Sequence, residues 1–411
     1  MNSARFLRRL FCHFGLILIC VCVLISCSSG SPVPPNVPDE SVVLRSEIVE
    51  EKPAASATIT LCGDILIHNT VARSSKSGDG YDFEPIFSAI KPLLAADVVI
   101  GNLESPVDAY GDNQKISSYP RFNAPNELIG GLKNVGFTTL ITANNHALDQ
   151  YYSGLARTRA LVLEAGITPV GTYADRRESE KPVILEANGI KIGIAAWTDS
   201  DNGMGGGIDQ DKRDYVLPTF SSQTTDDVDR MTADIVKLKE AGAEFIIFSL
   251  HWGAEYADAP TNMQKQIARA LVDAGADVIM GNHAHCVQPI ERYSGQRDGL
   301  IIYSLGNFIA DQFALNMQKT ARSMIVRITV TRDAGDQPAV LADACYIPTV
   351  IVRHSAFSLS GAGNGFRIYP AKEYADVTRT DGVPKGVTVT GIARDAYDAV
   401  FKIVGDVIES R

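Results

Sequence analysis

The sequence predicts an α/β protein in which mixed sheets form a sandwich flanked by helices, with an extension at the C-terminus. First, short apolar runs rich in β-branched residues alternate with segments of helical periodicity, a pattern typical of sheets covered by helices. Second, Asn188-Gly189 lies between two such runs and indicates a tight antiparallel hairpin. Third, late strand patterns follow residue 324 without the regular alternation that a barrel of eight strand–helix units requires.

Each expected strand is a short, largely apolar run, and each expected helix repeats apolar residues at intervals of three and four. In chain order, the expected strands are Thr58–Cys62, Asp97–Ile100, Thr138–Thr142, Val183–Glu186, Lys191–Trp197, Phe245–Leu250, Asp277–Met280, Leu300–Ser304, Met324–Thr331 and Val340–Tyr346. The expected helices are Phe83–Ala96, Asn126–Val135, Gly154–Ala165, Thr224–Ala241, Thr261–Ala274 and Ile392–Ile408. Before the last helix, Pro370 and Pro384 interrupt the pattern.

The N-terminal segment predicts an exported protein held at a membrane. Basic residues precede an apolar run that is too short for a confident membrane span and ends in Leu24-Ile25-Ser26-Cys27. That ending resembles a bacterial lipobox, which implies cleavage before Cys27 and a lipid on its thiol. The lipid would anchor the mature protein to the cell membrane on its outward-facing side. An ordinary signal peptide or an uncleaved anchor is the competing interpretation. We expect four parts: a signal peptide (1–26), a disordered Pro/Ser-rich tether (27–56), the main domain (57–350) and the C-terminal extension (351–411).

Composition excludes some classes of function. The formal net charge is −10, so the chain lacks the basic surface that nucleic-acid binding requires. Only Cys62, Cys286 and Cys345 remain beyond the signal region, which argues against a disulfide scaffold. The glycine-rich segment 203–207 lacks the Gly-Lys-Ser/Thr of a phosphate-binding loop. No Gly-x-Ser-x-Gly nucleophile motif is present either.

Five of the seven histidines lie in short motifs with Asp, Asn or Glu at the ends of expected strands. Including one histidine-free member, the motifs are Gly63-Asp64-x3-His68, Gly101-Asn102-Leu103-Glu104, Asn144-Asn145-His146-x2-Asp149, His251-Trp252-Gly253-x-Glu255 and Gly281-Asn282-His283-Ala284-His285. Imidazole, carboxylate and amide groups without clustered thiolates favour Zn, Mn or Fe. The set is too large for one tetrahedral ion, whereas two ions sharing a carboxylate would use it. Histidines with unrelated structural roles would not occur repeatedly at the ends of strands.

Spacing suggests how these side chains reach the ions. Asp64 and His68 are four residues apart, about one helical turn, so both could face one ion as the strand gives way to a helix or turn. Glu104 offers two oxygens suited to bridging two cations. His283 and His285 would point in opposite directions in an extended segment, so we expect a turned loop that lets each reach a different ion.

The order of the motifs resembles the calcineurin-like metallophosphoesterase superfamily and, within it, the capsule-synthesis CapA family, associated with poly-γ-glutamate. Ser304-Leu305-Gly306-Asn307-Phe308 adds to the match, which covers about residues 57–310. The resemblance implies a metallophosphoesterase-like fold and two divalent ions, Mn, Zn or Fe. It implies these ligands: Asp64, His68, Glu104 and His285 for one ion, and Glu104, Asn145, His251 and His283 for the other. The four-residue spacing of Asp64 and His68, and Glu104 in place of an aspartate, look usual for the CapA branch.

His146 belongs to neither implied ligand set. Because it follows Asn145 and precedes Asp149 by three residues, we expect a general acid oriented by a carboxylate; the alternative is a residue that only supports the loop. The expected function is capsule synthesis or export at the membrane, with anionic polyglutamate and membrane subunits of a synthesis complex as partners. The alternatives are an extracytoplasmic metal-dependent hydrolase unrelated to capsule, or a non-catalytic assembly factor that binds the polymer.

Overall fold

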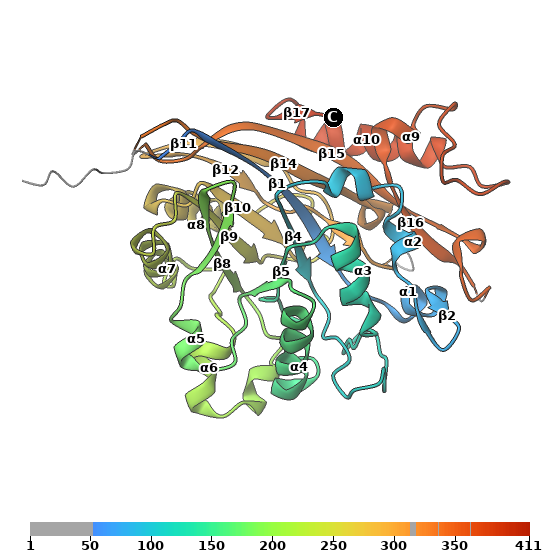
Figure 1. Cartoon of the computed structure of the whole chain (residues 1–411), viewed down its shortest axis with the longest axis horizontal. Coiled ribbons are helices and arrows are strands. Elements are labelled where there is room, and N and C mark those ends of the chain that lie inside the picture. Colours follow the sequence, from blue (N-terminus) through green and yellow to red (C-terminus); the bar gives the residue numbers. More distant parts are fainter. Residues whose placement is uncertain (1–51, 313–317, 336, 362) are drawn as a thin grey trace, which may run out of the picture. The chain divides into compact units, whose positions relative to one another are not determined.

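Two mixed sheets packed face to face form the centre of the protein (Figure 1). The structure is a computed structural model and describes residues 52–312, 318–335, 337–361 and 363–411. The expected signal peptide, Cys27 and most of the expected tether therefore lie outside the described residues. Within them, no helix has the length and apolarity that crossing a bilayer requires.

The first sheet combines the beginning and the end of the described chain. Its central strands are, in spatial order, β16 (Gly365–Pro370), β15 (Val340–His354), β14 (Arg322–Arg332), β1 (Ala55–Ile65), β4 (Val98–Leu103), β5 (Thr139–Ile141) and β6 (Thr168–Val170). Short strands β13 (Asn307–Ile309) and β17 (Glu409–Ser410) pair with β1 and β15. The strands from β1 to β6 run parallel, whereas β14, β15 and β16 are antiparallel. The expected boundary between residues 350 and 351 falls within β15.

The second sheet comes from one continuous stretch of chain. Its strands, in spatial order, are β11 (Ile290–Ser294), β12 (Asp298–Ile302), β10 (Val278–Asn282), β9 (Phe245–His251), β8 (Ile190–Thr198) and β7 (Val183–Ala187). The expected hairpin is confirmed: β7 pairs antiparallel with β8, and Asn188 and Gly189 between them have φ values of 50° and 80°. Both positive values are those of the turn that such a dipeptide favours.

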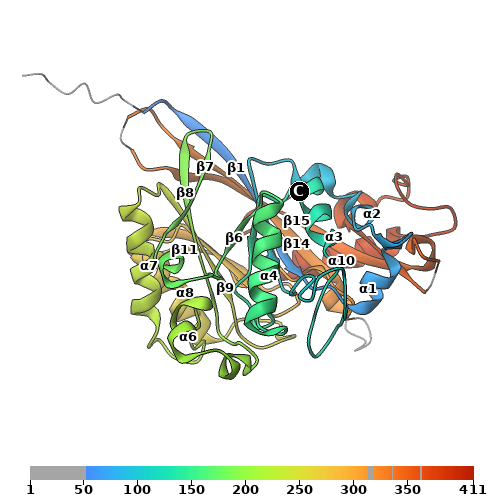
Figure 2. The ribbon, with the colours of Figure 1, turned by 60° about the horizontal axis from the view of Figure 1, so that its bottom comes forward.

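Helices cover the outer faces of both sheets (Figure 2). The longer ones are α3 (Glu127–Val135), α4 (Tyr151–Glu164), α7 (Val228–Glu240), α8 (Asn262–Ala274) and α10 (Thr390–Val404), and the short ones are α1 (Asn69–Ser74), α2 (Glu84–Phe87), α5 (Arg176–Ser179), α6 (Gln210–Val216) and α9 (Ala371–Tyr374). In β9, Phe245 and Ile247 face the other sheet, while Ile246 and Phe248 pack under α7 and α8. Because both faces are buried, the strand is apolar except for Ser249 and the terminal His251.

The predicted fold class is confirmed, but one expected helix is wrong. Phe83–Ala96 forms α2 followed by a separate 3-10 turn (Lys91–Leu94). Pro85 and Pro92 each stand near the start of one piece, and a proline in mid-helix removes a backbone donor and collides with the preceding turn. The three described cysteines are all buried and unbridged, so they pack as small apolar residues and no disulfide scaffold is formed among the described residues.

Candidate metal centre

The candidate ligands lie at the carboxyl ends of strands from both sheets. Asp64 is the last residue but one of β1, and Glu104 follows β4 directly. Asn145 follows β5 in the first sheet, whereas His251 ends β9 in the second. Parallel strands β9 and β10 bring His251 level with Asn282, so the residues after β10 enter the same space. Polar groups gather here because parallel strand ends meet at one edge, where loops are free to carry them.

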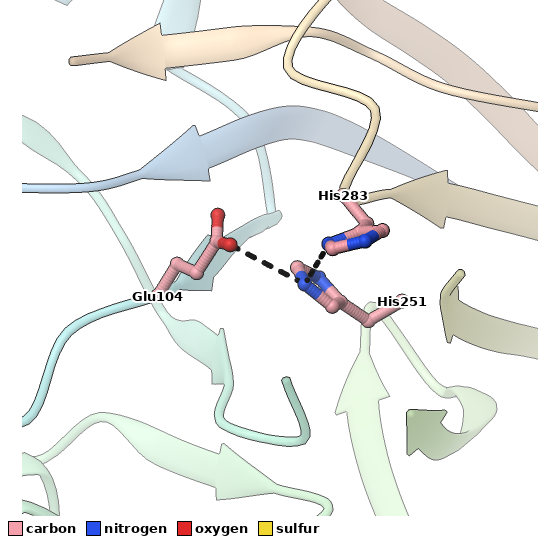
Figure 3. A group of neighbouring side chains, drawn as sticks. All are labelled: Glu104, His251 and His283. Atoms are coloured by element: carbon pink, nitrogen blue, oxygen red, sulfur yellow. Dashed lines mark hydrogen bonds and ion pairs between the residues drawn. The ribbon is translucent and has the colours of Figure 1, made fainter. Parts of the chain in front are cut away.

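Two overlapping groups of buried side chains result. Glu104, His251 and His283 form one group, and Asp64, Glu104 and His285 form the other; the ligand atoms within each group lie within 4.8 Å of one another. In Figure 3, the dashed lines from Glu104 and from His283 meet at the same nitrogen of the His251 ring. Glu104 belongs to both groups, the position expected of a bridging carboxylate. Each group takes residues from both sheets.

In the first group, polar atoms converge on His251. Its Nε2 lies 2.9 Å from Asn145 Oδ1, 3.0 Å from His283 Nδ1 and 3.3 Å from Glu104 Oε1. Burial lowers the pKa of His283 well below its usual value, and the neighbouring histidines His251 and His285 lower it further. A neutral imidazole has a free lone pair, which is the form that binds a metal.

In the second group, His285 lies between two carboxylates. Its Nδ1 is 2.9 Å from Asn307 Oδ1 and 3.3 Å from Asp64 Oδ2, and its Nε2 is 3.7 Å from Glu104 Oε1. Burial lowers the pKa of His285, but Glu104 and Asp64 outweigh it and raise the pKa to about 9. A proton on His285 therefore offsets the carboxylate charges where no cation does so.

Glu104 tests whether these residues fit a pair of cations. It is fully buried, yet neither carboxylate oxygen has a hydrogen-bond partner among the described residues. His251 Nε2 lies within ion-pair distance of Oε1 but is not aligned for a hydrogen bond. A buried carboxylate without partners costs several kcal/mol. Divalent cations bound by the two groups would supply the missing partners of this carboxylate, so the donor set fits metal ions.

The left-handed loop after β10 separates the last two histidines. His283 and His285 have φ values of 91° and 56°, which residues other than glycine seldom adopt. This is the expected turned loop, and it places each histidine in a different group. Backbone strain of this kind, about 1–3 kcal/mol per residue, persists where surrounding structure fixes it and is common at functional sites.

His146 stands outside both groups and contacts Asp149. Its Nδ1 lies 2.8 Å from Asp149 Oδ2, which also accepts a hydrogen bond of 2.7 Å from the Phe122 backbone nitrogen. Burial lowers the pKa of His146, but the bond to Asp149 and the nearby Glu104 carboxylate outweigh it and raise the pKa. The Phe122 ring packs against the imidazole at a centroid distance of 4.7 Å. His146 is thus fixed in orientation, with Nδ1 engaged by the carboxylate.

His68 is the one expected histidine ligand that belongs to neither group. The expectation of a helical turn between Asp64 and His68 is wrong, because α1 begins only at Asn69 and His68 is extended. The His68 Nδ1 lies 3.1 Å from the Asp311 backbone nitrogen and 3.3 Å from the Leu66 carbonyl oxygen. Burial, with help from His285 and His146, lowers the pKa of His68 to about 4.

Asparagine side chains support the candidate ligands, and sequence reasoning assigned two of them no role. Asn102 Nδ2 lies 2.8 Å from Asp64 Oδ1 and 3.2 Å from His251 Nδ1, so it links the two sheets. Asn144 Nδ2 donates to the Leu103 carbonyl oxygen at 2.8 Å. Both lie within the motifs, and their position beside Glu104 or Asn145 was the available signal. Such contacts orient metal ligands.

A cleft of about 430 Å³ opens beside Asn145 and His283. Its lining includes the carboxylates Asp199 and Glu255, with serine hydroxyl and amide groups. Asp199 Oδ2 accepts hydrogen bonds from Ser222 Oγ at 2.6 Å and the Gly253 nitrogen at 2.7 Å. Burial raises the pKa of Asp199 although both hydrogen bonds oppose the change.

A second cavity, of about 880 Å³, lies elsewhere. Its lining includes Ile246, Asp277 and Asp298, at the beginnings of β9, β10 and β12. These strand starts are at the opposite end of the sheet from His251 and His283. Its charged groups pair locally, as Arg297 does with Asp277 and Lys52 with Glu244. We therefore place the chemistry at the smaller cleft, where the buried ligand-type side chains converge.

Comparison with known proteins identifies relatives of this chain. Residues 58–312 match the model of a family described as "Bacterial capsule synthesis protein PGA_cap". The chain is 30% identical over 267 residues to the "Capsule biosynthesis protein CapA" of Bacillus anthracis, covering 64% of this chain and 62% of that protein. It is 32% identical over 253 residues to the "PGA biosynthesis protein CapA" of Bacillus subtilis, covering 61% and 62%. The matched part thus spans about three fifths of these relatives.

More distant likenesses follow. A "Probable polyglutamine synthesis accessory protein" of Mycobacterium tuberculosis is 30% identical over 256 residues, which cover 60% of this chain and 65% of that protein. Among solved structures, a hypothetical protein from Thermus thermophilus aligns with 13% identity and a TM-score of 0.38, over 68% of this chain and 97% of that chain.

Proposed function

Given that the chain belongs to the bacterial capsule synthesis protein PGA_cap family, we propose that it acts in the synthesis or export of a poly-γ-glutamate capsule through a two-metal, phosphoesterase-like site. The observation that carries the metal site is Glu104, a fully buried carboxylate that is shared by two ligand groups and has no hydrogen-bond partner among the described residues. A structural carboxylate would have found such partners during folding.

The proposed ions are Mn, Zn or Fe, because the donors combine imidazole with oxygen. One would be held by Asp64, Glu104 and His285, and the other by Glu104, Asn145, His251 and His283. His68 remains a predicted further ligand of the first. When bound, a pair of divalent ions polarises the bond to be cleaved and offsets the negative charge that develops there.

His146 is the proposed proton-transfer residue. Its Nδ1 contacts Asp149, so Nε2 is the nitrogen left to exchange a proton with substrate. Asp149 fixes the imidazole orientation and, by its charge, favours the protonated form. His146 therefore can donate to a leaving group, while Asp149, bound to the Phe122 nitrogen, acts as a positioning residue.

We place this activity outside the cell, at the membrane surface. The support is the sequence around Cys27, whose lipid would hold the main domain on a Pro/Ser-rich tether. Anionic polyglutamate and membrane subunits of a synthesis complex are the proposed partners. A negatively charged polymer can approach a negatively charged protein at such a site because bound ions carry positive charge.

The test compares single-ligand variants from the two groups. We expect purified wild-type protein to hold two transition-metal ions per chain by elemental analysis, and His251→Ala and His285→Ala each to lose at least one. His354→Ala is the matched control, since His354 lies at the end of β15 and outside both groups. Wild-type protein with no bound metal under any loading condition contradicts the proposal.

Activity then separates an enzyme from an assembly factor. Each preparation is assayed for cleavage of a generic phosphodiester and of poly-γ-glutamate, and each gene is tested for restoring capsule to a deletion strain. Loss of cleavage and of capsule in both ligand variants supports the enzyme. If wild-type protein binds the polymer but cleaves neither substrate, the non-catalytic assembly role is correct instead.

A further inference from the structure

The cleft beside the candidate metal centre is lined by acidic side chains. It adjoins Asn145 and His283, so a molecule that fills it also reaches the first ligand group. Asp199 and Glu255 line it, and no lysine or arginine among the described residues does so. Its volume of about 430 Å³ is within the usual range for small-ligand sites. It is therefore a cleft of small-ligand size with negative charge on its own walls.

The two carboxylates have no cationic side-chain partner among the described residues. Neither Asp199 nor Glu255 forms an ion pair with any described residue, whereas Glu244, in the larger cavity, pairs with Lys52 and Arg332. The two hydrogen bonds that Asp199 Oδ2 accepts come from neutral donors, the Ser222 hydroxyl and the Gly253 nitrogen. A carboxylate taken partly out of water without a counter-charge is costly, and a cationic ligand would remove that cost.

The proposed substrate class has one such cation. A polyglutamate chain carries a carboxylate on every unit, and those groups would be repelled by Asp199 and Glu255. Only its amino end is positive. We propose that the cleft binds the free amino end of an acidic, peptide-like chain, with its ammonium group donating hydrogen bonds to Asp199 and Glu255 and the next polar group turned toward the metal centre.

The rest of the lining suits an ammonium group. Such a group has three donors and no acceptor, so it needs several oxygen acceptors. Besides the two carboxylates, Ser200 and Ser221 offer hydroxyl oxygens and Asn202 an amide oxygen. This inference rests on the proposed function only for the identity of the polymer. On this inference, the cleft recognises the amino end of a polymer chain and not the middle of the chain.

The experiment compares two probes that differ only at that end. Isothermal titration of the metal-loaded full chain uses γ-linked triglutamate with a free amino end and the same peptide with an acetylated end. We expect the free peptide to bind at least about tenfold more tightly, because hydrogen bonds to charged groups contribute strongly. Glu255→Gln, at an exposed residue, should abolish most of this preference, and Asp199→Asn should weaken it.

Controls keep this result separate from the metal proposal. Glu164→Gln removes an exposed carboxylate at the end of α4, outside the cleft, and should leave the preference unchanged. Metal content is measured in every sample. Equal binding of the two peptides, no binding of either, or an undiminished preference in Glu255→Gln overturns the inference even when two ions are bound. A preference that persists in protein that binds no metal supports the cleft while the metal proposal fails.

Discussion

Replacing the shared carboxylate should remove both ions at once. Glu104→Gln keeps the size of the side chain and one oxygen but removes the negative charge that both ligand groups use. In the absence of metal, the variant should differ little in stability from wild type, because Glu104 makes no hydrogen bond to a described residue and loses only its ion-pair contacts with His251 and His285. In the presence of metal, it should lose the stabilisation that binding provides. The substitution should therefore change the stability of the protein more in the presence of metal than in its absence.

The size of the effect follows from mass action. An ion present at about 100 times its dissociation constant stabilises the folded state by about 2.7 kcal/mol, so two independent ions contribute roughly 5 kcal/mol. A domain of roughly 360 residues has an unfolding entropy of about 0.75 kcal/mol/K, so each kcal/mol shifts the melting temperature by about 1.3 °C. We expect metal to raise the wild-type melting temperature by about 7 °C and that of Glu104→Gln by less than about 2 °C.

Thermal unfolding with and without added Mn²⁺ or Zn²⁺, together with elemental analysis, measures both quantities. Glu164→Gln serves as the control, since it removes an exposed glutamate outside both groups. His251→Ala belongs to only one group and should retain about half of the shift. If metal raises the melting temperature of Glu104→Gln as much as that of wild type, Glu104 does not bridge two ions.

Three further predictions follow from other parts of the chain. His146→Ala should lose about 10²–10⁴-fold in rate while keeping its metal, and Asp149→Asn should lose less; full activity in His146→Ala refutes the role. Burial raises the pKa of Asp277 to about 6 from 3.8, so this carboxyl stabilises the folded state below about pH 4, and roughly 3 kcal/mol is lost as the pH rises through 6. Asp277→Asn should flatten that slope in urea unfolding between pH 4 and pH 7, and an unchanged slope contradicts the assignment. Cys27→Ala should abolish metabolic labelling with fatty acid, and persistent labelling excludes the lipid anchor.

Long periodic segments were predictable because local pattern and tertiary burial agree. β9 and α8 lie within a residue or two of the expected ranges. The apolar run of β9 and the amphipathic repeat of α8 can each bury their apolar residues in only one position. Three-residue β6 and half-exposed β11 were missed, because their strand character comes from pairing rather than from sequence pattern. Pro85 and Pro92 divided into two short pieces a helix that apolar spacing alone had favoured.

For the site, residues next to strand ends were the predictable ones. Glu104 and His251 come together because strand direction fixes where each chain segment emerges. His68 was harder, since its position depends on how many residues the chain uses before α1 begins, which periodicity does not state. The role of Asn102 was hidden because the side chain acts across the two sheets, on Asp64 and His251, and sequence alone does not pair residues so distant.

The way each ligand group takes residues from both sheets also constrains the order of folding. The second sheet comes from Val183–Ile302 alone, so it can form once that stretch is available. The first sheet must wait for β14, which pairs with β1 across more than two hundred and fifty intervening residues. Long-range pairing of this kind is slow because the entropy of closing the loop is lost before any stabilising contact forms. We therefore expect metal to bind late in folding, after the two sheets have assembled, and not to nucleate folding.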